Sequence, residues 1–224
     1  RAGFTNLSID LIFGLPGQTA DMFEHTLDKA LELDLPHTSI YSLKVEENTL
    51  FHTLYERNEL MLPDEDEELD MFLRAIRRYR DAGYDHYEIS NFAKPGYRSR
   101  HNMTYWKNES YYGIGAGAHG YAAGWRHVNI KGVTPYIQAA RERLPRLESY
   151  EVSRDEAMET FMMVGLRMLD GVAKRDFHAQ FGVGMDEVFA EPIRSSLEKG
   201  LLEPTLDGYR LTERGRAELV RLVR

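Results

Sequence analysis

A single carboxylate inside an apolar run is the first feature of this sequence that could do chemistry. Asp10 stands in the segment NLSIDLIFGLPGQT (residues 6–19), which ends in a Gly/Pro stop and is followed by a helical pattern. Its length and β-branched content predict a strand buried on both faces, as in a parallel α/β sheet. Ligands of such sheets gather at the carboxyl ends of strands, so Asp10 near that end is a candidate hydroxyl acceptor. The sequence equally allows Asp10 to cap or salt-bridge a neighbouring loop.

A second group joins an imidazole, an amide and two large aromatic rings in HNMTYW (residues 101–106), which we expect in a loop. Such a group can line a site for a planar ligand, with His101 as a metal ligand and Trp106 as an apolar wall. The alternative is that the rings anchor the loop and that His101 bonds a carbonyl. Chemistry alone favours this alternative.

The glycine-rich segment GIGAGAHG (residues 113–120) is a poor dinucleotide fingerprint. No amphipathic helix follows it, and no acidic residue closes a βαβ unit some twenty residues later. We expect its glycines to let the backbone approach a flat ligand or cross a barrel mouth, and the alternative is a tight core strand and turn. His119 is a second loop imidazole with the same two interpretations. By contrast, the acidic run at residues 64–67 indicates helix capping rather than metal binding.

Composition narrows the class of protein. The 224 residues are 42% hydrophobic, enough for one large or two modest domains. A formal net charge of −8 without a basic tract argues against a general phosphate-backbone binder. Neither a signal peptide nor an apolar stretch of about 18 residues is present, so we expect a soluble, cytoplasmic protein without a membrane span.

Two further features concern what this chain can do alone. It has no cysteine, so by itself it can form no disulfide and no thiolate-ligated zinc or iron–sulfur site. It begins with Arg1 rather than Met, shortly before a core strand that needs parallel neighbours. We therefore expect a piece of a longer protein.

Hydrophobic periodicity predicts an α/β region followed by helices. A helix after Thr19 and a strand at residues 37–45 complete a βαβ unit with the first strand. Further elements are expected as helices at 49–59, 64–83 and 134–143, a strand at 87–92 and a hairpin-like stretch at 125–130. Pro145 and the polar residues after it give the best boundary, hence domains at 1–148 and 149–224.

From Ser153, a capping box and helices near 174–181 and 185–199 precede a turn at 207–208 and a last helix. This order is the outline of a winged helix. Acidic residues predominate in the candidate recognition helix at 185–199, which argues against nucleic-acid binding.

These segments together resemble one known family. IDLIFGLPGQT, the YSL strand, the YEISNFA…HNMTYW…GIGAGAHG block and the helical C-terminus are similar to the oxygen-independent coproporphyrinogen III oxidase family of radical S-adenosylmethionine proteins. The resemblance covers essentially the whole chain. HNxxYW looks like the HemW branch, whose members are described as haem chaperones, whereas the HemN branch holds the oxidases.

The resemblance implies the C-terminal part of a partial (β/α)6 barrel with added strands, followed by the family's winged-helix-like C-terminal domain. It places the [4Fe–4S] cluster on a CxxxCxxC loop upstream, so no metal ligand is expected in this chain. Asp10, Ile12, Lys44 and His119 match or align approximately with positions near S-adenosylmethionine. His101 and Trp106 are the haem candidates.

The implied function is a haem chaperone that, at full length, binds haem, the cluster and S-adenosylmethionine. The alternative is an oxidase that decarboxylates coproporphyrinogen III to protoporphyrinogen IX. Expected partners are haem or a porphyrinogen and haem-acceptor proteins, with no nucleic acid, and peripheral membrane association is left open. We expect this cysteine-free chain to be inactive alone.

Overall fold

A computed structural model describes residues 3–222, so Arg1 lies outside the described residues. The chain divides into two compact units. The first contains the residues up to Ser99, the short segment Met168–Gly171 and the residues from Ala190 onward. The second contains Arg100–Arg167 and Val172–Phe189. These two units are groups of residues in contact, and the domain boundary predicted at residue 149 stays a prediction.

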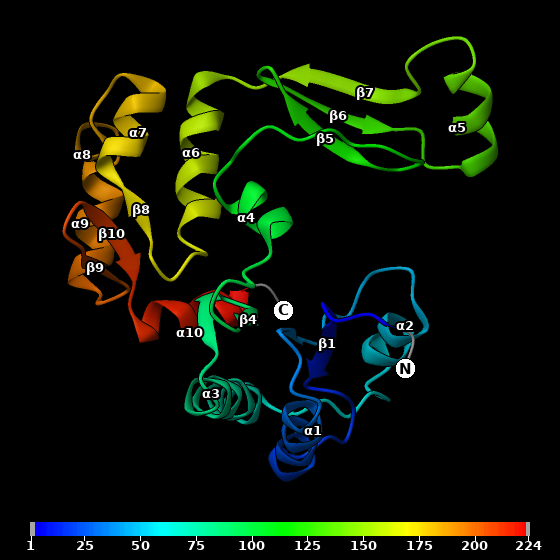
Figure 1. The fold of residues 1–224 in the computed structure, drawn as a ribbon, viewed down its shortest axis with the longest axis vertical. Helices are drawn as coiled ribbons and strands as arrows, with labels where there is room; N and C mark the ends of the chain where they lie inside the picture. The colour runs from blue at the N-terminus through cyan, green and yellow to red at the C-terminus, as the bar shows by residue number, and fades with distance from the viewer. Residues whose placement is uncertain (1–2, 223–224) are drawn as a thin grey trace. The chain divides into compact units, whose positions relative to one another are not determined.

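The first unit is built around a four-stranded sheet. Strand β1 (Ser8–Phe13), helix α1 (Ala20–Glu32) and strand β2 (His37–Ser42) form the predicted βαβ unit, with β1 and β2 parallel. The sheet continues in the order β1-β2-β4-β3 with two short antiparallel strands, β3 (Asp85–Glu88) and β4 (Asn91–Ala93). Figure 1 shows α1 and α3 (Glu65–Asp81) beside one another in this unit.

The single strand predicted at residues 87–92 is wrong, because the chain reverses there. Ile89 and Ser90 separate β3 from β4, and the Glu88 carboxylate accepts the backbone N–H of Ser90 at 3.0 Å. This bond closes a turn that has no glycine or proline to announce it.

Helix starts follow the capping chemistry of the sequence. Asp64 caps α3 by accepting the Glu67 N–H at 2.8 Å, and the Glu67 carboxylate accepts the Asp64 N–H at 3.0 Å. The predicted capping role of the acidic run is thereby confirmed for these two residues. Helix α2 (Leu50–Glu56) begins in the same manner at Thr49, whose hydroxyl accepts the His52 N–H.

The apolar core lies between the sheet and helices α1 and α3. Phe13 is almost fully buried, and its ring centroid lies 5.5 Å from that of Phe23 in α1 and 6.2 Å from that of Phe72 in α3. The prediction that β1 is buried on both faces is wrong, since Ser8, Asp10 and Ile12 are exposed. Successive side chains of a strand point to opposite faces of the sheet, and in β1 one of these faces meets the core while the other is open.

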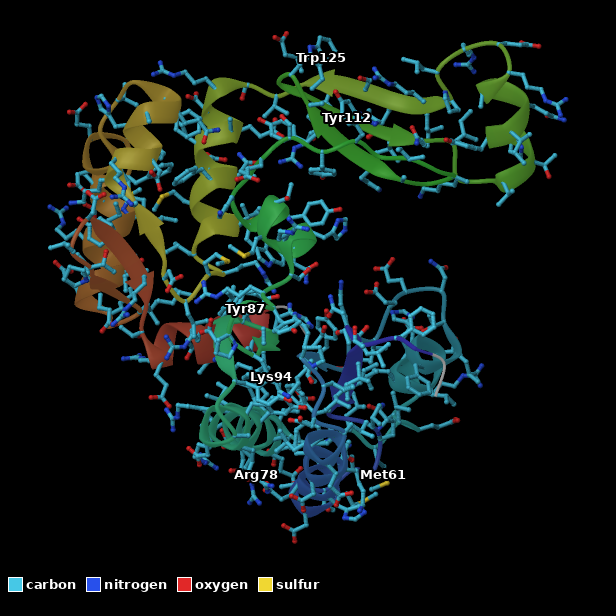
Figure 2. All side chains as sticks on the ribbon, in the orientation of Figure 1. Met61, Arg78, Tyr87, Lys94, Tyr112 and Trp125 are labelled. Atoms are coloured by element: carbon cyan, nitrogen blue, oxygen red, sulfur yellow. The ribbon has the colours of Figure 1, made fainter. Side chains whose placement is uncertain are left out.

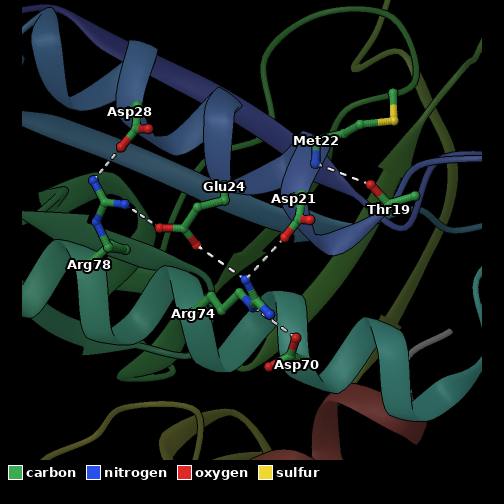
Figure 3. A network of polar contacts seen from close by, with 8 residues as sticks. All are labelled: Thr19, Asp21, Met22, Glu24, Asp28, Asp70, Arg74 and Arg78. Atoms are coloured by element: carbon green, nitrogen blue, oxygen red, sulfur yellow. Dashed lines mark hydrogen bonds and ion pairs between the residues drawn. The ribbon is translucent and has the colours of Figure 1, made fainter.

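An ion-pair network joins α1 to α3 outside this core (Figure 3). Arg78 of α3 donates to Glu24 and Asp28 of α1. Arg74, one turn earlier, pairs with Asp70 at 2.8 Å and approaches Asp21 and Glu24. All these groups are partly exposed, so the network adds modestly to the stability that core packing provides.

The remaining elements of the first unit are α9 (Ala190–Glu198), the antiparallel pair β9 (Leu202–Pro204) and β10 (Gly208–Leu211), and α10 (Glu213–Leu222). The turn predicted at residues 207–208 is thus confirmed, and it joins β9 to β10. The single helix predicted at 185–199 is wrong, because α8 (Met185–Val188) ends before α9 begins. Phe189 leaves the helical conformation between them, and its ring packs 5.9 Å from that of Phe177.

The second unit holds a three-stranded antiparallel sheet of β5 (His119–Ala122), β6 (Trp125–Asn129) and β7 (Arg146–Glu151). Its helices are α4 (Arg100–Trp106), α5 (Val133–Ala140), α6 (Arg154–Gly165), α7 (Lys174–Phe181) and α8, and the short strand β8 is Val172–Ala173. The loop predicted for HNMTYW is wrong, because these residues form most of α4. Residue 149, where the predicted boundary falls, lies inside β7, which pairs with β6.

The mixed α/β class predicted from the sequence is confirmed. Among the described residues, no helix has both the length and the apolar character that crossing a membrane requires.

Candidate functional site

The open side of β1 and β2 carries the first group of predicted site residues. Asp10 lies opposite Ser39 in the parallel register, and Ile12 lies opposite Tyr41. Asp10 is exposed in the middle of β1 rather than near its carboxyl end, which corrects the sequence-based placement. Its carboxylate needs no buried partner because it stays in solvent. Ile12 (46% exposed) and Tyr41 (40% exposed) add an apolar surface beside it.

Polar residues continue from Asp10 across the sheet. Ser39 of β2 pairs with Asn91 of β4, and the Asn91 side-chain amide donates to the Glu88 carboxylate of β3. Ser39, Asn91 and Glu88 are all buried, and Glu88 has no exposed surface. The row therefore runs from an exposed carboxylate to a fully buried one, held by hydrogen bonds at its inner end.

Near the amino ends of β1 and β2, a histidine links three segments. His37 Nδ1 lies 2.9 Å from Ser8 Oγ, and its Nε2 lies 2.9 Å from Tyr87 Oη. Tyr87, labelled in Figure 2, accepts the Ser99 N–H at 3.2 Å, which leaves its own proton for His37. Burial lowers the pKa of His37, with Asp10 acting in the opposite direction, and burial raises the pKa of Tyr87 to about 12. The group is therefore a neutral structural network rather than an ionised pair.

The carboxyl ends of β1 and β2 are joined by a buried carboxylate that the sequence did not reveal. Glu68 of α3 accepts a hydrogen bond from Ser42 Oγ at 3.2 Å. Its Oε1 would lie 2.9 Å from a Cβ added at Gly14, whose φ of +75° already favours glycine. Glu68 thus fixes the chain where it leaves the sheet.

Lys44 lies two residues beyond β2 and is exposed, with its ammonium 3.2 Å from the Glu46 carboxylate. The residues on either side of it, Leu43 and Val45, line a cavity of about 460 Å³. Its wall also contains two carboxylates, an imidazole, a phenol and one further apolar side chain, from Glu47, Glu65, His52, Tyr55 and Leu62 respectively. Asp10, Ile12 and Lys44 therefore all belong to the first unit.

The haem candidates belong to the second unit, on α4. His101 is exposed, and its Nε2 lies 3.0 Å from the hydroxyl of Tyr105, one turn along the helix. Trp106 is partly buried, and the Arg167 guanidinium lies over its ring at 4.4 Å from the centroid. Trp106 Nε1 is buried without a hydrogen-bond partner among the described residues. The packing of Trp106 fits the anchoring interpretation, whereas His101 remains accessible to a ligand.

His119, at the start of β5, is exposed and pairs with Val128 of β6. Two glycines near it, Gly113 and Gly120, meet protein atoms, whereas Gly115 has open space where a Cβ would stand. A Cβ at Gly113 would overlap the His119 carbonyl, and one at Gly120 would overlap the buried imidazole of His127. At these two positions the glycines are explained by close packing of the strand and turn, the alternative given above.

Residues 3–222 contain no group of three or more His, Asp or Glu side chains that could hold a metal ion. Sequence reasoning gave no role to His37, Glu68 or His127, and it took Tyr105 only as one of the two aromatic rings of HNMTYW. Only Tyr105 had a usable signal, its i, i+4 spacing from His101, which becomes meaningful once the segment is helical.

Comparisons with known proteins show what the chain is similar to. Residues 152–217 match the HemN C-terminal domain family. The haem chaperone HemW of Bacillus subtilis is 43% identical over 96% of this chain and 57% of its own length. HemW of Escherichia coli is 32% identical over 96% of this chain and 56% of its own length.

Among solved structures, the coproporphyrinogen III oxidase HemN of Escherichia coli, described as a radical SAM enzyme, matches with a TM-score of 0.74. The match covers 99% of this chain and 54% of that protein at 21% identity, so it speaks for the fold. The chain spans little more than half the length of the relatives it matches. Residues 152–217 thus belong to the HemN C-terminal domain family, nearly the whole chain is similar in sequence to HemW proteins, and its fold is that of the matching part of HemN.

Proposed function

We propose that this chain is the C-terminal part of a haem chaperone and that His101 is its haem-iron ligand. The observation that carries the proposal is an exposed imidazole on α4, within a segment that resembles the chaperone branch. A neutral imidazole is a common ligand of haem iron, and exposure lets a flat macrocycle reach it. Similarity to HemW proteins over nearly the whole chain supports the choice of haem as cargo.

The test is a haemin titration of the full-length protein, followed by absorbance in the Soret region. We expect a shifted Soret band in the wild type that weakens strongly in His101→Ala. His178→Ala is a matched control, because His178 is also an exposed histidine of a helix in the second unit. An unchanged haemin spectrum with the wild type, or equal spectra for wild type and His101→Ala, would reject the proposal.

S-adenosylmethionine is proposed as the cofactor of the first unit. Asp10 would accept hydrogen bonds from hydroxyl groups, and Ile12 would offer an apolar contact beside it. The open face of β1 fits these roles, since both side chains are exposed. When bound beside a reduced [4Fe–4S] cluster, S-adenosylmethionine supplies radical chemistry, and the cluster's cysteines must come from outside this chain. Lys44 is a weaker candidate for this vicinity, and His119, which belongs to the second unit, stays a prediction from the sequence alone.

A second candidate function is oxidative decarboxylation of coproporphyrinogen III. The fold shared with HemN and the carboxylate on the open face of β1 favour it. Anaerobic assay of the reconstituted full-length protein with S-adenosylmethionine and a reductant decides between the two. We expect no protoporphyrinogen, and its formation would make the oxidase the better assignment.

The chaperone proposal also includes haem-acceptor proteins as partners and a cytoplasmic location. The resemblance to the chaperone branch suggests both. Transfer of haem from the loaded protein to acceptor proteins would test the first, and cell fractionation the second.

A further inference from the structure

Tyr105 is the neighbour of His101 whose role the proposed function leaves unexplained. Its hydroxyl oxygen lies 3.0 Å from His101 Nε2, and the two rings meet edge to face with centroids 4.8 Å apart. This i, i+4 contact runs along one side of α4. The imidazole is therefore held at the nitrogen farthest from its own backbone.

Tyr105 is in turn held from its other side. Its ring meets Tyr111 edge to face, with centroids 4.6 Å apart. Tyr111 is joined to Tyr121 of β5 by two backbone hydrogen bonds, of 2.6 Å and 2.9 Å. A chain of contacts thus connects the sheet to His101, and the Tyr105 hydroxyl is fixed where it meets the imidazole.

The chemistry of the imidazole makes this contact a competitor for iron. Nδ1 is bonded to Cγ, close to Cβ, so a porphyrin bound there would clash with the backbone of His101. Nε2 is on the far side of the ring, where a porphyrin has room. Nε2 carries either one proton or one lone pair, so it serves one partner at a time. Iron can bind at Nε2 only as the hydrogen bond to Tyr105 breaks, and the Tyr105 hydroxyl can bond to Nε2 again as iron leaves.

We propose that Tyr105 is a positioning residue that competes with haem iron for His101 Nε2 and thereby keeps haem binding reversible. The proposal rests on the proposed function, because it assumes His101 as the iron ligand. The step is a ligand exchange without redox change: the iron–nitrogen bond forms as the hydrogen bond breaks, and any proton on Nε2 moves to Nδ1 through solvent. Release is the reverse step.

Tyr105→Phe removes the hydroxyl and keeps the ring that packs on Tyr111. Haemin is titrated into the full-length variant, and its release to excess apomyoglobin is timed. Because Tyr105→Phe removes one hydrogen bond that competes with iron for His101 Nε2, the variant's dissociation constant for haemin should be about 2- to 10-fold lower than that of the wild type. Most of this difference should come from slower release of haemin. The Soret maximum should stay where the wild type has it, since His101 remains the ligand.

Tyr97→Phe is the matched control, because Tyr97 is a part-exposed tyrosine of the first unit, and its variant should bind like the wild type. Tyr105→Leu, which also frees Nε2, should change release in the same direction, and circular dichroism checks the fold of each variant. Equal or weaker haemin binding by Tyr105→Phe, with binding still lost in His101→Ala, would overturn the competition alone. Binding unaffected by His101→Ala would overturn the proposed function as well.

Discussion

Gly120→Ala should destabilise the β5–β6–β7 sheet, because the space beside this glycine is already filled. His127 is 8% exposed, and a Cβ added at Gly120 would overlap its Cε1 and lie 2.5 Å from its Nε2. The same Cβ would lie 2.7 Å from the backbone nitrogen of Gly113, which cannot move away as a side chain can. Overpacking of this kind costs about 1–3 kcal/mol, and two neighbours place the expected loss at about 2–3 kcal/mol.

A double-mutant cycle separates the two neighbours. His127→Ala removes the ring but leaves the Gly113 nitrogen, so in that background Gly120→Ala should cost only about 1 kcal/mol. The difference is a coupling of about 1–2 kcal/mol between residues 120 and 127. Gly124→Ala is the control: its φ of +79° strains an alanine, yet open space surrounds it. Its cost of about 1–2 kcal/mol should be the same in both backgrounds.

The assay is urea unfolding of the 224-residue chain followed by tryptophan fluorescence. The two tryptophans, Trp106 and Trp125, both belong to the second unit, so the signal reports on the unit that holds the mutations (Figure 2 labels Trp125). A Gly120→Ala variant as stable as the wild type would refute the packing argument. So would an equal cost in both backgrounds, and either result would restore the interpretation in which the glycines face a ligand.

Three further predictions concern the first unit. Burial lowers the pKa of His86 to about 4. The unfolded chain therefore binds a proton at His86 more readily than the folded chain, so the free energy of unfolding should fall by up to about 3 kcal/mol between about pH 6.5 and pH 4. In His86→Phe the free energy of unfolding should change less with pH over this range. Arg78→Met removes the ion pairs with Glu24 and Asp28 and should lower the free energy of unfolding by about 1 kcal/mol, and by less in 1 M salt. The control Arg77→Met, at an exposed neighbouring position, should change it by less than about 0.5 kcal/mol. Equal losses for both variants would contradict a stabilising role of the network. Phe13→Ala should cost about 3–5 kcal/mol in chemical denaturation, and a loss under 1 kcal/mol would show that the core does not close over this ring.

The elements that could be predicted from the sequence are those whose causes are local. The βαβ unit follows from hydrophobic periodicity over about forty residues, and the start of α3 follows from the reciprocal bonds of Asp64 and Glu67. The β9–β10 hairpin follows from its turn. In each case the residues that decide the structure are close together in the chain.

The errors arise where distant residues decide. An apolar run does not say which face of a strand is covered, so the exposure of Asp10 depends on α1 and α3 packing on one side only. The turn between β3 and β4 depends on the buried Glu88, and no periodicity announces it. HNMTYW has too few apolar residues to predict a helix, although its His–Tyr spacing suits one.

The candidate site residues were chosen from the sequence by residue type, and their roles are untested. An exposed carboxylate and an exposed imidazole in polar surroundings, Asp10 and His101, stand where a ligand can reach them, and their roles remain proposals. The groups that hold such residues in place, Glu68, His37 and Tyr105, could not be found, because their contacts arise only in the folded chain.

A haem-chaperone function of this chain depends most on iron ligation by His101. Magnetic circular dichroism of the ferric haem complex of the full-length protein reads the axial ligand directly. We predict a histidine-ligated spectrum in the wild type that disappears in His101→Ala and persists in His178→Ala. The same histidine-ligated spectrum in His101→Ala would show that another residue holds the iron and would contradict the proposed role of His101.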